Sequence, residues 1–361
     1  MDKLAIDGGD SIYKQPFPIR PKTTPASDLN PSQLLQKEFS DYLNIDPKQI
    51  IIAESYELAC QEIVRSFEQY GEGIENILLP IIGTNRISKN IGNLNINLHF
   101  GDVDAETGNI SSRAIANSFT ENTHVLICKH NFGHPVNFDE ISMITQSHKC
   151  LIIEDASASI GATYKNMKTG LLGDIAIFGF GESHLLHAEG HHGAVVVVKN
   201  LEIANILYTN LEFPSKETSQ LLLAEFRNRE IELLNRRRLA WELDLELRNF
   251  KGIRRMEHAN NIKHSYDKYV LRVRSLLWKR DLEDTINALL AEGIQCEIAY
   301  PVFNNSNENL STKENNHPSD EYPVATRLAK ESIALPLHTG MNYLDIEKIL
   351  TALRKIESAS I

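Results

Sequence analysis

Short apolar runs alternate along residues 1–200 with segments of helical periodicity. Seven runs have the length and composition of β-strands, at residues 49–53, 76–80, 96–100, 124–130, 150–156, 174–180 and 194–198. Several of them lack polar alternation, as expected for strands that are covered on both faces. The clearest helix is predicted from Ser55 to about Tyr70, with its apolar residues on one face and Gly71 as its end.

The repeated order of strand, helix and strand predicts an α/β fold with a mixed, mostly parallel sheet wrapped by helices. We predict a large α/β domain at residues 1–200, with residues 1–30 as an N-terminal arm. The charged sequence of residues 201–260 predicts connecting helices. Residues 261–361 predict a small C-terminal α+β domain, whose last two helices are separated by the stretch LPLHTG.

Composition narrows the classes of partner. The 361 residues carry a formal charge of −11 with a pI of about 5.7, which argues against nucleic acid or an anionic membrane, since both require an excess of Lys and Arg. The N-terminus has no signal-peptide pattern, and no stretch approaches the ~18 apolar residues of a spanning helix. We therefore expect a cytoplasmic protein. The four cysteines have no CxxC spacing, which predicts buried, reduced thiols.

The ends of the predicted strands are the places to look for chemistry, because ligands of open parallel sheets bind there. Glu154 and Asp155 end one strand, where a charge is costly unless a cation or a donor meets it. We expect a carboxylate that faces a bound cation, with Asp155 as a simple turn cap as the alternative. Ser55 and Tyr56 begin a helix directly after a strand, a geometry that binds phosphate on free backbone amides.

Longer motifs occur at residues 101–111 (GDVDAETGNIS), 129–141 (KHNFGHPVNFDEI) and 152–180 (IIEDASASIGATYKNMKTGLLGDIAIFGF). They resemble the DegT/DnrJ/EryC1/StrS aminotransferases, fold type I enzymes that use pyridoxal phosphate on nucleotide-linked keto sugars and cyclitols. The resemblance covers almost the whole chain. It implies a homodimer, a sugar or cyclitol ligand, and either pyridoxal phosphate (PLP) or pyridoxamine phosphate (PMP) as the cofactor.

The resemblance also implies roles for single residues. Asp155 falls where the family's aspartate pairs with the pyridinium nitrogen, and His130 where a strand-end histidine lies near the cofactor. Ser55 and Tyr56 fall at the start of the helix that binds the cofactor's phosphate in the family. Ala158 falls where the family has a glutamine near the ring hydroxyl, and Gly179 where it has a phosphate-binding serine.

Several of these positions depart from the family pattern. His184 stands where the family has the lysine that forms the Schiff base, and Glu54 replaces the glycine that opens the phosphate helix. Losing two or three charge-assisted contacts, at ~1.5–3 kcal/mol each, would weaken phosphate binding by several orders of magnitude. We therefore expect ordinary transamination to be disfavoured.

Three interpretations remain open. The first is a catalytically inactive or regulatory homologue in sugar, cyclitol or polysaccharide biosynthesis. The second is a sugar 3-dehydratase-like enzyme, in which PMP binds non-covalently and His184 transfers the proton, because imidazole titrates near neutrality. The third is a metal site formed by His187, His191 and a nearby glutamate, which we do not expect because no ligand set of defined geometry is visible. A conventional aminotransferase would need its lysine from elsewhere.

Overall fold

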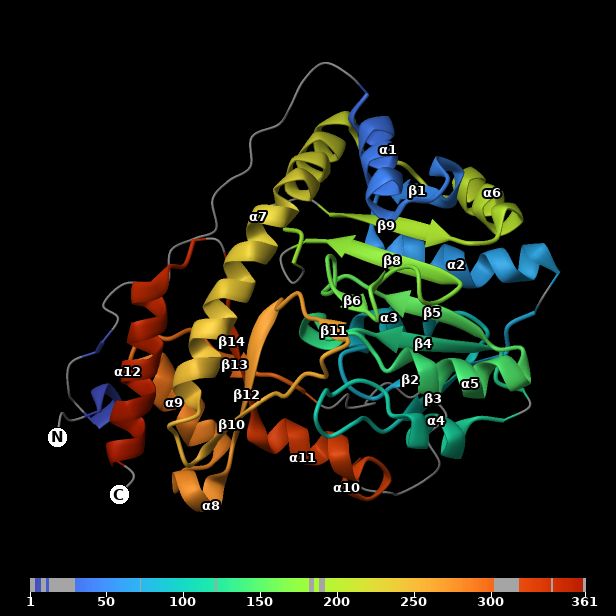
Figure 1. Ribbon diagram of the computed structural model, residues 1–361. Helices are drawn as coiled ribbons and strands as arrows, with labels where there is room; N and C mark the ends of the chain where they lie inside the picture. The colour runs from blue at the N-terminus through green and yellow to red at the C-terminus, as the bar shows by residue number, and fades with distance from the viewer. Residues whose placement is uncertain are drawn as a thin grey trace.

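The computed structural model describes residues 4–7, 11–12, 30–71, 73–120, 122–181, 185–187, 192–301, 318–338 and 340–359. These residues form a seven-stranded sheet covered by helices, a four-stranded antiparallel sheet near the C-terminus, and a long helix that runs beside both (Figure 1).

The large sheet confirms the predicted mixed, mostly parallel arrangement. Its strands are β1 (Ile50–Ala53), β2 (Asn76–Pro80), β3 (Asn97–Gly101), β4 (Val125–Lys129), β5 (Leu151–Asp155), β8 (Ile175–Phe180) and β9 (Gly193–Val198), in the order β1-β9-β8-β5-β4-β2-β3. The five strands from β3 to β8 pair in parallel, whereas β9 runs antiparallel to both β8 and β1. Because side chains alternate between the faces of a strand, both faces of these apolar strands need a helical cover.

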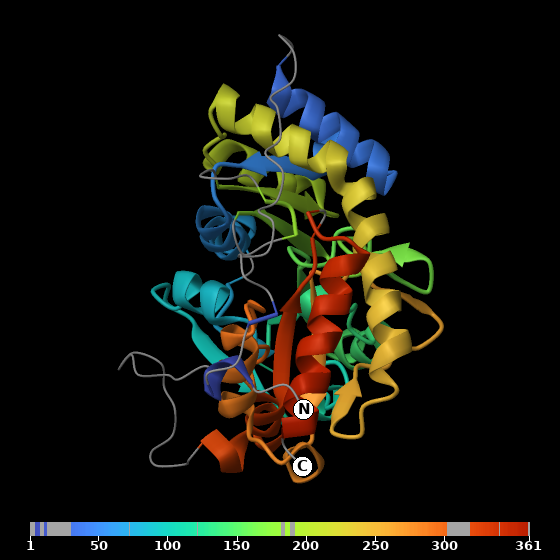
Figure 2. The same ribbon diagram turned by 90° about the vertical axis from the view of Figure 1, so that its left-hand side faces the viewer.

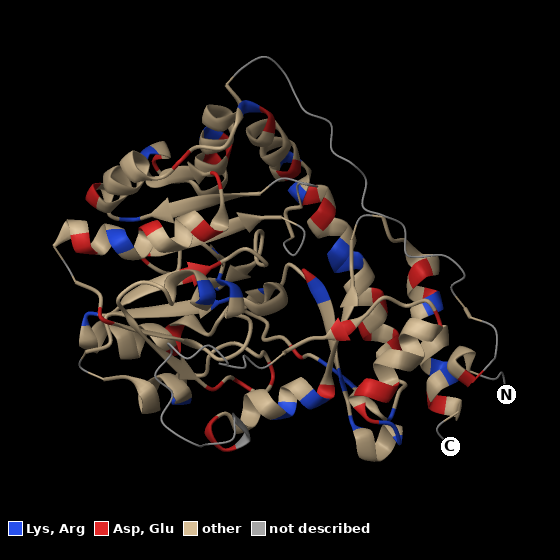
Figure 3. Ribbon diagram, turned by 180° about the vertical axis from the view of Figure 1, so that it is seen from behind, with Lys and Arg blue, Asp and Glu red and all other residues tan. Residues whose placement is uncertain are grey.

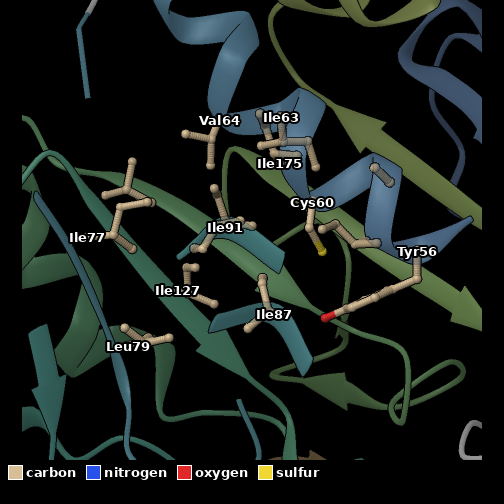
Figure 4. Packing of buried hydrophobic residues seen from close by; sticks show 14 of the residues in the cluster. Tyr56, Cys60, Ile63, Val64, Ile77, Leu79, Ile87, Ile91, Ile127 and Ile175 are labelled. Atoms are coloured by element: carbon tan, nitrogen blue, oxygen red, sulfur yellow. The ribbon is translucent and has the colours of Figure 1, made fainter. Parts of the chain in front are cut away.

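Helices cover both faces. They are α1 (Pro31–Leu43), α2 (Tyr56–Tyr70), α3 (Asn85–Ile91), α4 (Ser112–Ser118), α5 (Phe138–His148), α6 (Leu201–Asn210) and α7 (Lys216–Leu247). Helices α2, α3 and α6 share one apolar cluster with Ile51, whereas α1 and α7 share another with Ile50 and Ile52. Figure 4 shows Ile63 of α2 packed among Ile77, Ile127 and Ile175 of the strands. The helix predicted from Ser55 is α2, capped by Ser55 and ended by Gly71 in the left-handed region.

The C-terminal part contains the antiparallel sheet. Its strands are β10 (Ile253–Arg255), β12 (Lys268–Val273), β13 (Glu297–Ile298) and β14 (Ser332–Pro336), in the order β10-β12-β14-β13. The helices are α8 (Ser275–Trp278), α9 (Leu282–Ala291), α10 (Pro318–Glu321), α11 (Pro323–Glu331) and α12 (Tyr343–Ala359). One prediction was incomplete: residues 332–336 form an interior strand, which pairs with β12 on one side and β13 on the other and buries Ile333 and Leu335 in the core.

Three short 3-10 helices and one small sheet complete the described part of the chain. The helices are η1 (Ala5–Asp7), η2 (Pro47–Gln49) and η3 (Asn131–Gly133), and the strands are β6 (Thr163–Tyr164), β7 (Met167–Lys168) and β11 (Ile262–Lys263). Strand β11 pairs with the β6–β7 hairpin and so joins the chain after β10 to the large sheet's loops.

Helix α7 links the two large elements. Figures 1 and 2 both show it running from α1, beside the large sheet, to α12, beside the C-terminal sheet.

Lys and Arg are interspersed with Asp and Glu along the helices (Figure 3). None of the described helices is long and apolar enough to cross a membrane. All four cysteines are free, and three are buried as predicted, whereas Cys296 is half-buried.

Candidate functional site

Asp155 lies buried at the carboxyl end of β5, where the sequence predicted a carboxylate facing a cation. The cation is supplied by the protein itself: the Lys129 Nζ donates to Asp155 Oδ2 at 2.7 Å. The main-chain N–H of Ser157 donates to the other oxygen, Oδ1, at 3.2 Å. Both carboxylate oxygens therefore accept hydrogen bonds from this chain.

Tyr56 is a second donor to the same oxygen. Its hydroxyl donates to Asp155 Oδ2 at 3.0 Å from the first turn of α2. Burial, with the negative charge of Asp155 as the next cause, raises the pKa of Tyr56 well above its ordinary value of 10, so the hydroxyl stays protonated and donates. Figure 4 shows the Tyr56 side chain reaching away from α2, with Cys60 one turn further along the helix. The prediction that Tyr56 and Asp155 belong to one site stays a prediction, but the structure brings them into contact.

Sequence reasoning missed Lys129. It ends β4 directly opposite Asp155 in the parallel register of β4 and β5. A lysine that ends an otherwise apolar strand is itself a signal, because neighbouring parallel strands end at the same edge of the sheet. Its side chain is 17% exposed and that of Asp155 is 3% exposed, so the pair is largely shielded from water.

His130 points to the other face of the sheet, because successive residues of a strand alternate. Its Nε2 lies 2.8 Å from Glu154 Oε2, and its Nδ1 accepts the N–H of Val136 at 3.1 Å. Glu154 in turn accepts the N–H groups of Gly170 and Gly173. Both ring nitrogens of His130 are therefore used inside the protein, away from the Asp155 carboxylate, and its expected place near the cofactor stays a prediction.

The start of α2, predicted to bind a phosphate, has its own cap. Ser55 Oγ accepts the N–H of Leu58 at 3.1 Å, which satisfies one of the free amides of the helix. Glu54 is exposed beside it, and Glu57 in the first turn accepts the Nε of Arg86 at 2.6 Å. Burial alone would raise the pKa of Glu57, but the hydrogen bond from Arg86 brings it below its ordinary value, so this carboxylate is charged at neutral pH.

Ala158 lies in the turn after β5, whereas Gly179 lies within β8. The N–H of Gly179 donates to Ser157 Oγ at 2.9 Å, and the carbonyl oxygen of Ala158 accepts the Ser265 hydroxyl at 2.9 Å. Both are therefore near the carboxylate through main-chain contacts, without a side-chain group to offer a ligand. The roles expected for them at a cofactor remain predictions.

A strap from the C-terminal part, residues 264–267, crosses these loops. Ser265 also donates from its main-chain N–H to the Gly133 carbonyl at 3.2 Å. Gly133 has φ +94°, and a Cβ there would lie 2.0 Å from Ser265 Oγ, so only glycine fits beneath the strap. Arg236 and Arg237 of α7 donate to carbonyl oxygens of the strap, which fixes it over the site.

The loop after β8 was predicted to carry the catalytic position. His184 and His191 lie outside the described residues. The main-chain N–H of His187 donates to Glu225 Oε2 at 3.2 Å, and His192 is exposed before β9. Within the described parts of the chain, no group of three or more His, Cys, Asp or Glu residues is placed to hold a metal ion.

Three other histidines form a cluster, and one of them, His264, belongs to the strap. The rings of His134, His258 and His264 have centroids 4.6–5.5 Å apart. Burial lowers the pKa of His134 and of His258 from 6.5 to about 4, with His258 and Arg255 as the respective next causes. Burial also lowers the pKa of His264, whose Nδ1 accepts the N–H of Tyr266 at 2.7 Å. All three rings are therefore neutral at pH 7.

Acid is expected to destabilise the fold through this cluster. A histidine with a lowered pKa binds no proton when folded but binds one when unfolded, so its contribution to stability is intact above pH 6.5 and is lost as the pH falls towards 4. At pH 5 the loss for His134 alone is about 2 kcal/mol. Urea denaturation at pH 7.5 and pH 5 measures it. A His134→Gln variant whose stability falls as steeply with pH as that of the unmodified protein would refute the assignment.

A family model described as the DegT/DnrJ/EryC1/StrS aminotransferase family matches residues 87–213 and 215–354. The chain belongs to this family. The resemblance found in the motifs is thereby confirmed at the level of the family, and the α/β fold at the level of the structure.

Three relatives illustrate the range. The chain is 27% identical over 279 residues to a UDP-N-acetyl-3-dehydro-α-D-glucosamine 3-aminotransferase of Acidithiobacillus ferrooxidans, covering 71% of this chain and 70% of that protein. It is 32% identical over 108 residues to a dTDP-4-dehydro-2,6-dideoxy-D-glucose 3-dehydratase of Saccharopolyspora spinosa, which covers 30% and 23%. The putative sugar aminotransferase Spr1654 of Streptococcus pneumoniae, in its PLP form, superposes with a TM-score of 0.80 at 16% identity, covering 95% and 94%.

The family uses PLP or PMP, and the Spr1654 protein is known in both forms. The residues of this chain fit that cofactor poorly at both ends. At the end of β5, Lys129 already binds the carboxylate that would face the pyridinium nitrogen. A phosphate would bind at the start of α2, but there the Ser55 hydroxyl already accepts a main-chain N–H, and the carboxylates of Glu54 and Glu57 lie beside it.

Proposed function

We propose that this chain is a member of its family that no longer catalyses ordinary amino transfer, and that it acts as an inactive or chemically altered homologue in sugar, cyclitol or polysaccharide biosynthesis. The expected ligand is a nucleotide-linked sugar or cyclitol, and the expected assembly is a homodimer. His184, in place of the Schiff-base lysine, is the sequence feature that first suggests this function.

The start of α2 is the observation that supports the proposal most strongly. A helix N-terminus binds a phosphate through free amides and the positive end of the helix dipole. Here the Ser55 hydroxyl satisfies an amide, and the charged Glu57 stands in the first turn with its Arg86 partner bound to it. A phosphate dianion would meet a carboxylate there, and the neighbouring cation, Arg86, is already paired with that carboxylate. The cofactor's binding would be weakened by orders of magnitude, which disfavours any reaction that depends on holding it.

Amino transfer from glutamate tests the proposal directly. The full-length protein, incubated with PLP, L-glutamate as the amino donor and a nucleotide-linked keto sugar as the amino acceptor, is expected to form no 2-oxoglutarate above the level of heat-denatured protein. The A. ferrooxidans relative serves as the positive control in the same assay. Catalytic formation of 2-oxoglutarate, at many equivalents per protein chain, would contradict the proposed function.

A 3-dehydratase is the second candidate. It is favoured by the match to the S. spinosa enzyme and by His184, an imidazole that can move a proton near neutral pH. Incubation with PMP and a nucleotide-linked 4-keto sugar, followed by mass spectrometry, would reveal loss of the 3-hydroxyl oxygen. A His184→Ala variant that loses this product while a His187→Ala variant keeps it would establish the second candidate in place of the first.

A further inference from the structure

We infer that the ammonium group of Lys129 occupies the place at Asp155 that the cofactor's ring nitrogen would take, so that this chain excludes the cofactor with a cation of its own. The inference deepens the proposed function and rests on it. PLP enzymes pair the ring nitrogen with a protein carboxylate, and Asp155 is a buried carboxylate at the carboxyl end of the central strands.

The pairing is built into the sheet. Lys129 and Asp155 are register partners on neighbouring parallel strands, and their N···O distance is 2.7 Å. The Tyr56 hydroxyl donates to the same carboxylate oxygen at 3.0 Å. A carboxylate oxygen with two donors, one of them charged, is a strong and directed arrangement. It leaves this oxygen satisfied while no other molecule is bound.

Gly83 makes room for the lysine. It lies between β2 and α3 with φ +79°, a conformation that favours glycine. A Cβ at this position would lie 2.4 Å from Asn131 Oδ1, 2.9 Å from Cδ of Lys129 and 3.2 Å from Cε of Lys129. A side chain at residue 83 would therefore press on the stem of Lys129 where it reaches Asp155. Gly83 and Lys129 thus fit each other at this site.

The Lys129 ammonium and a pyridinium nitrogen are alternative partners for Asp155, because both are cations. A pyridinium nitrogen at Asp155 would lie within a few ångströms of the ammonium, and like charges at that distance disfavour each other in a shielded site. The ring would have to displace Lys129, whose side chain is only 17% exposed and would lose its carboxylate partner. Any group that binds Asp155 therefore competes with Lys129, and the Lys129 ammonium disfavours a cationic ring most.

Two substitutions of Lys129 test the inference. Lys129→Met removes the charge and keeps the length, and Lys129→Gln also removes the charge but keeps a hydrogen-bond donor for Asp155. Lys129→Arg keeps the cation and is the matched control. Binding of PLP and of PMP is measured by difference absorbance at ~330–430 nm and by calorimetry, so that no activity is needed. Circular dichroism identifies the variants that are folded.

The expected result is saturable binding by the Met or Gln variant at least about tenfold tighter than by the unmodified protein, with no gain for Lys129→Arg. Folded Met or Gln variants that gain nothing would overturn the inference, and so would tight binding by the unmodified protein. Neither result depends on the glutamate assay. Amino transfer by the unmodified protein would contradict the proposed function, whereas an absent gain in the variants would contradict only the role of Lys129.

Discussion

Asp155→Ala is expected to destabilise the folded protein by about 3–5 kcal/mol, the usual cost of breaking a buried ion pair by removing one partner. The substitution leaves the Lys129 ammonium in a shielded place without this carboxylate and removes the hydrogen bond that the buried Tyr56 hydroxyl donates to Asp155. Chemical denaturation at pH 7.5, without any added cofactor, measures the loss.

The sign of this effect is informative. In an enzyme that keeps a buried carboxylate ready for a cofactor cation, removing it relieves an unpaired charge and leaves the empty protein equally or more stable. In this chain the partner is already present, so the same substitution must destabilise.

A double-mutant cycle sharpens the comparison. Asp155→Ala combined with Lys129→Met is expected to cost less than the sum of the two single substitutions, with a coupling energy of about 1–3 kcal/mol. Asp155→Asn, which keeps an acceptor for Tyr56, is expected to fall between the unmodified protein and Asp155→Ala. Additive effects of the two substitutions would show that the contact contributes nothing.

Glu292→Ala is expected to lower the free energy of unfolding by a similar amount, about 3–5 kcal/mol, because Glu292 is another buried charge that accepts hydrogen bonds from several groups. Its side chain is fully buried and lies 2.9 Å from the Lys355 Nζ, which is 9% exposed. It also accepts the main-chain N–H groups of Ala5 and Ile12, which tie the start of the chain to the C-terminal part. Thermal and urea denaturation would record the loss.

Glu246 offers the matched control. It forms an ion pair with Arg354 at 2.9 Å, but the two side chains are 42% and 49% exposed. Exposed pairs contribute about 0–1 kcal/mol, so Glu246→Ala should leave stability nearly unchanged. Equal effects of the two substitutions would contradict the importance given to burial. Proteolysis near residues 4–12 should increase in Glu292→Ala and remain unchanged in Glu246→Ala.

The fold could be predicted largely from the sequence because its strands are continuous apolar runs. The runs predicted at residues 124–130 and 150–156 are β4 and β5 to within one residue at each end, as expected for strands covered on both faces. The strand at residues 332–336 was not recognised because it is short, ends at Pro336 and lacks alternation. Its strand state is decided by its position between β12 and β13, which is information that a local pattern does not contain.

The candidate site was predicted only in part, for a related reason. Sequence identified Asp155 as a carboxylate that needs a cation, and the structure supplies that cation in Lys129. The sequence could not show which side chains pair with each other, because the residues that meet across two strands depend on the register of those strands. Alternation along each strand then separates neighbours: Lys129 and Asp155 meet on one face, whereas His130 and Glu154 meet on the other. The structure places His130 against Glu154, and the expected role of His130 near the cofactor stays a prediction.

A crystal structure of the unmodified protein, determined after soaking with saturating PLP, is the most direct measurement. If the protein supplies its own cation, electron density will place Lys129 Nζ at hydrogen-bond distance from Asp155, with no pyridine ring over the carboxylate. A ring nitrogen on Asp155, with the Lys129 side chain turned away, would contradict it.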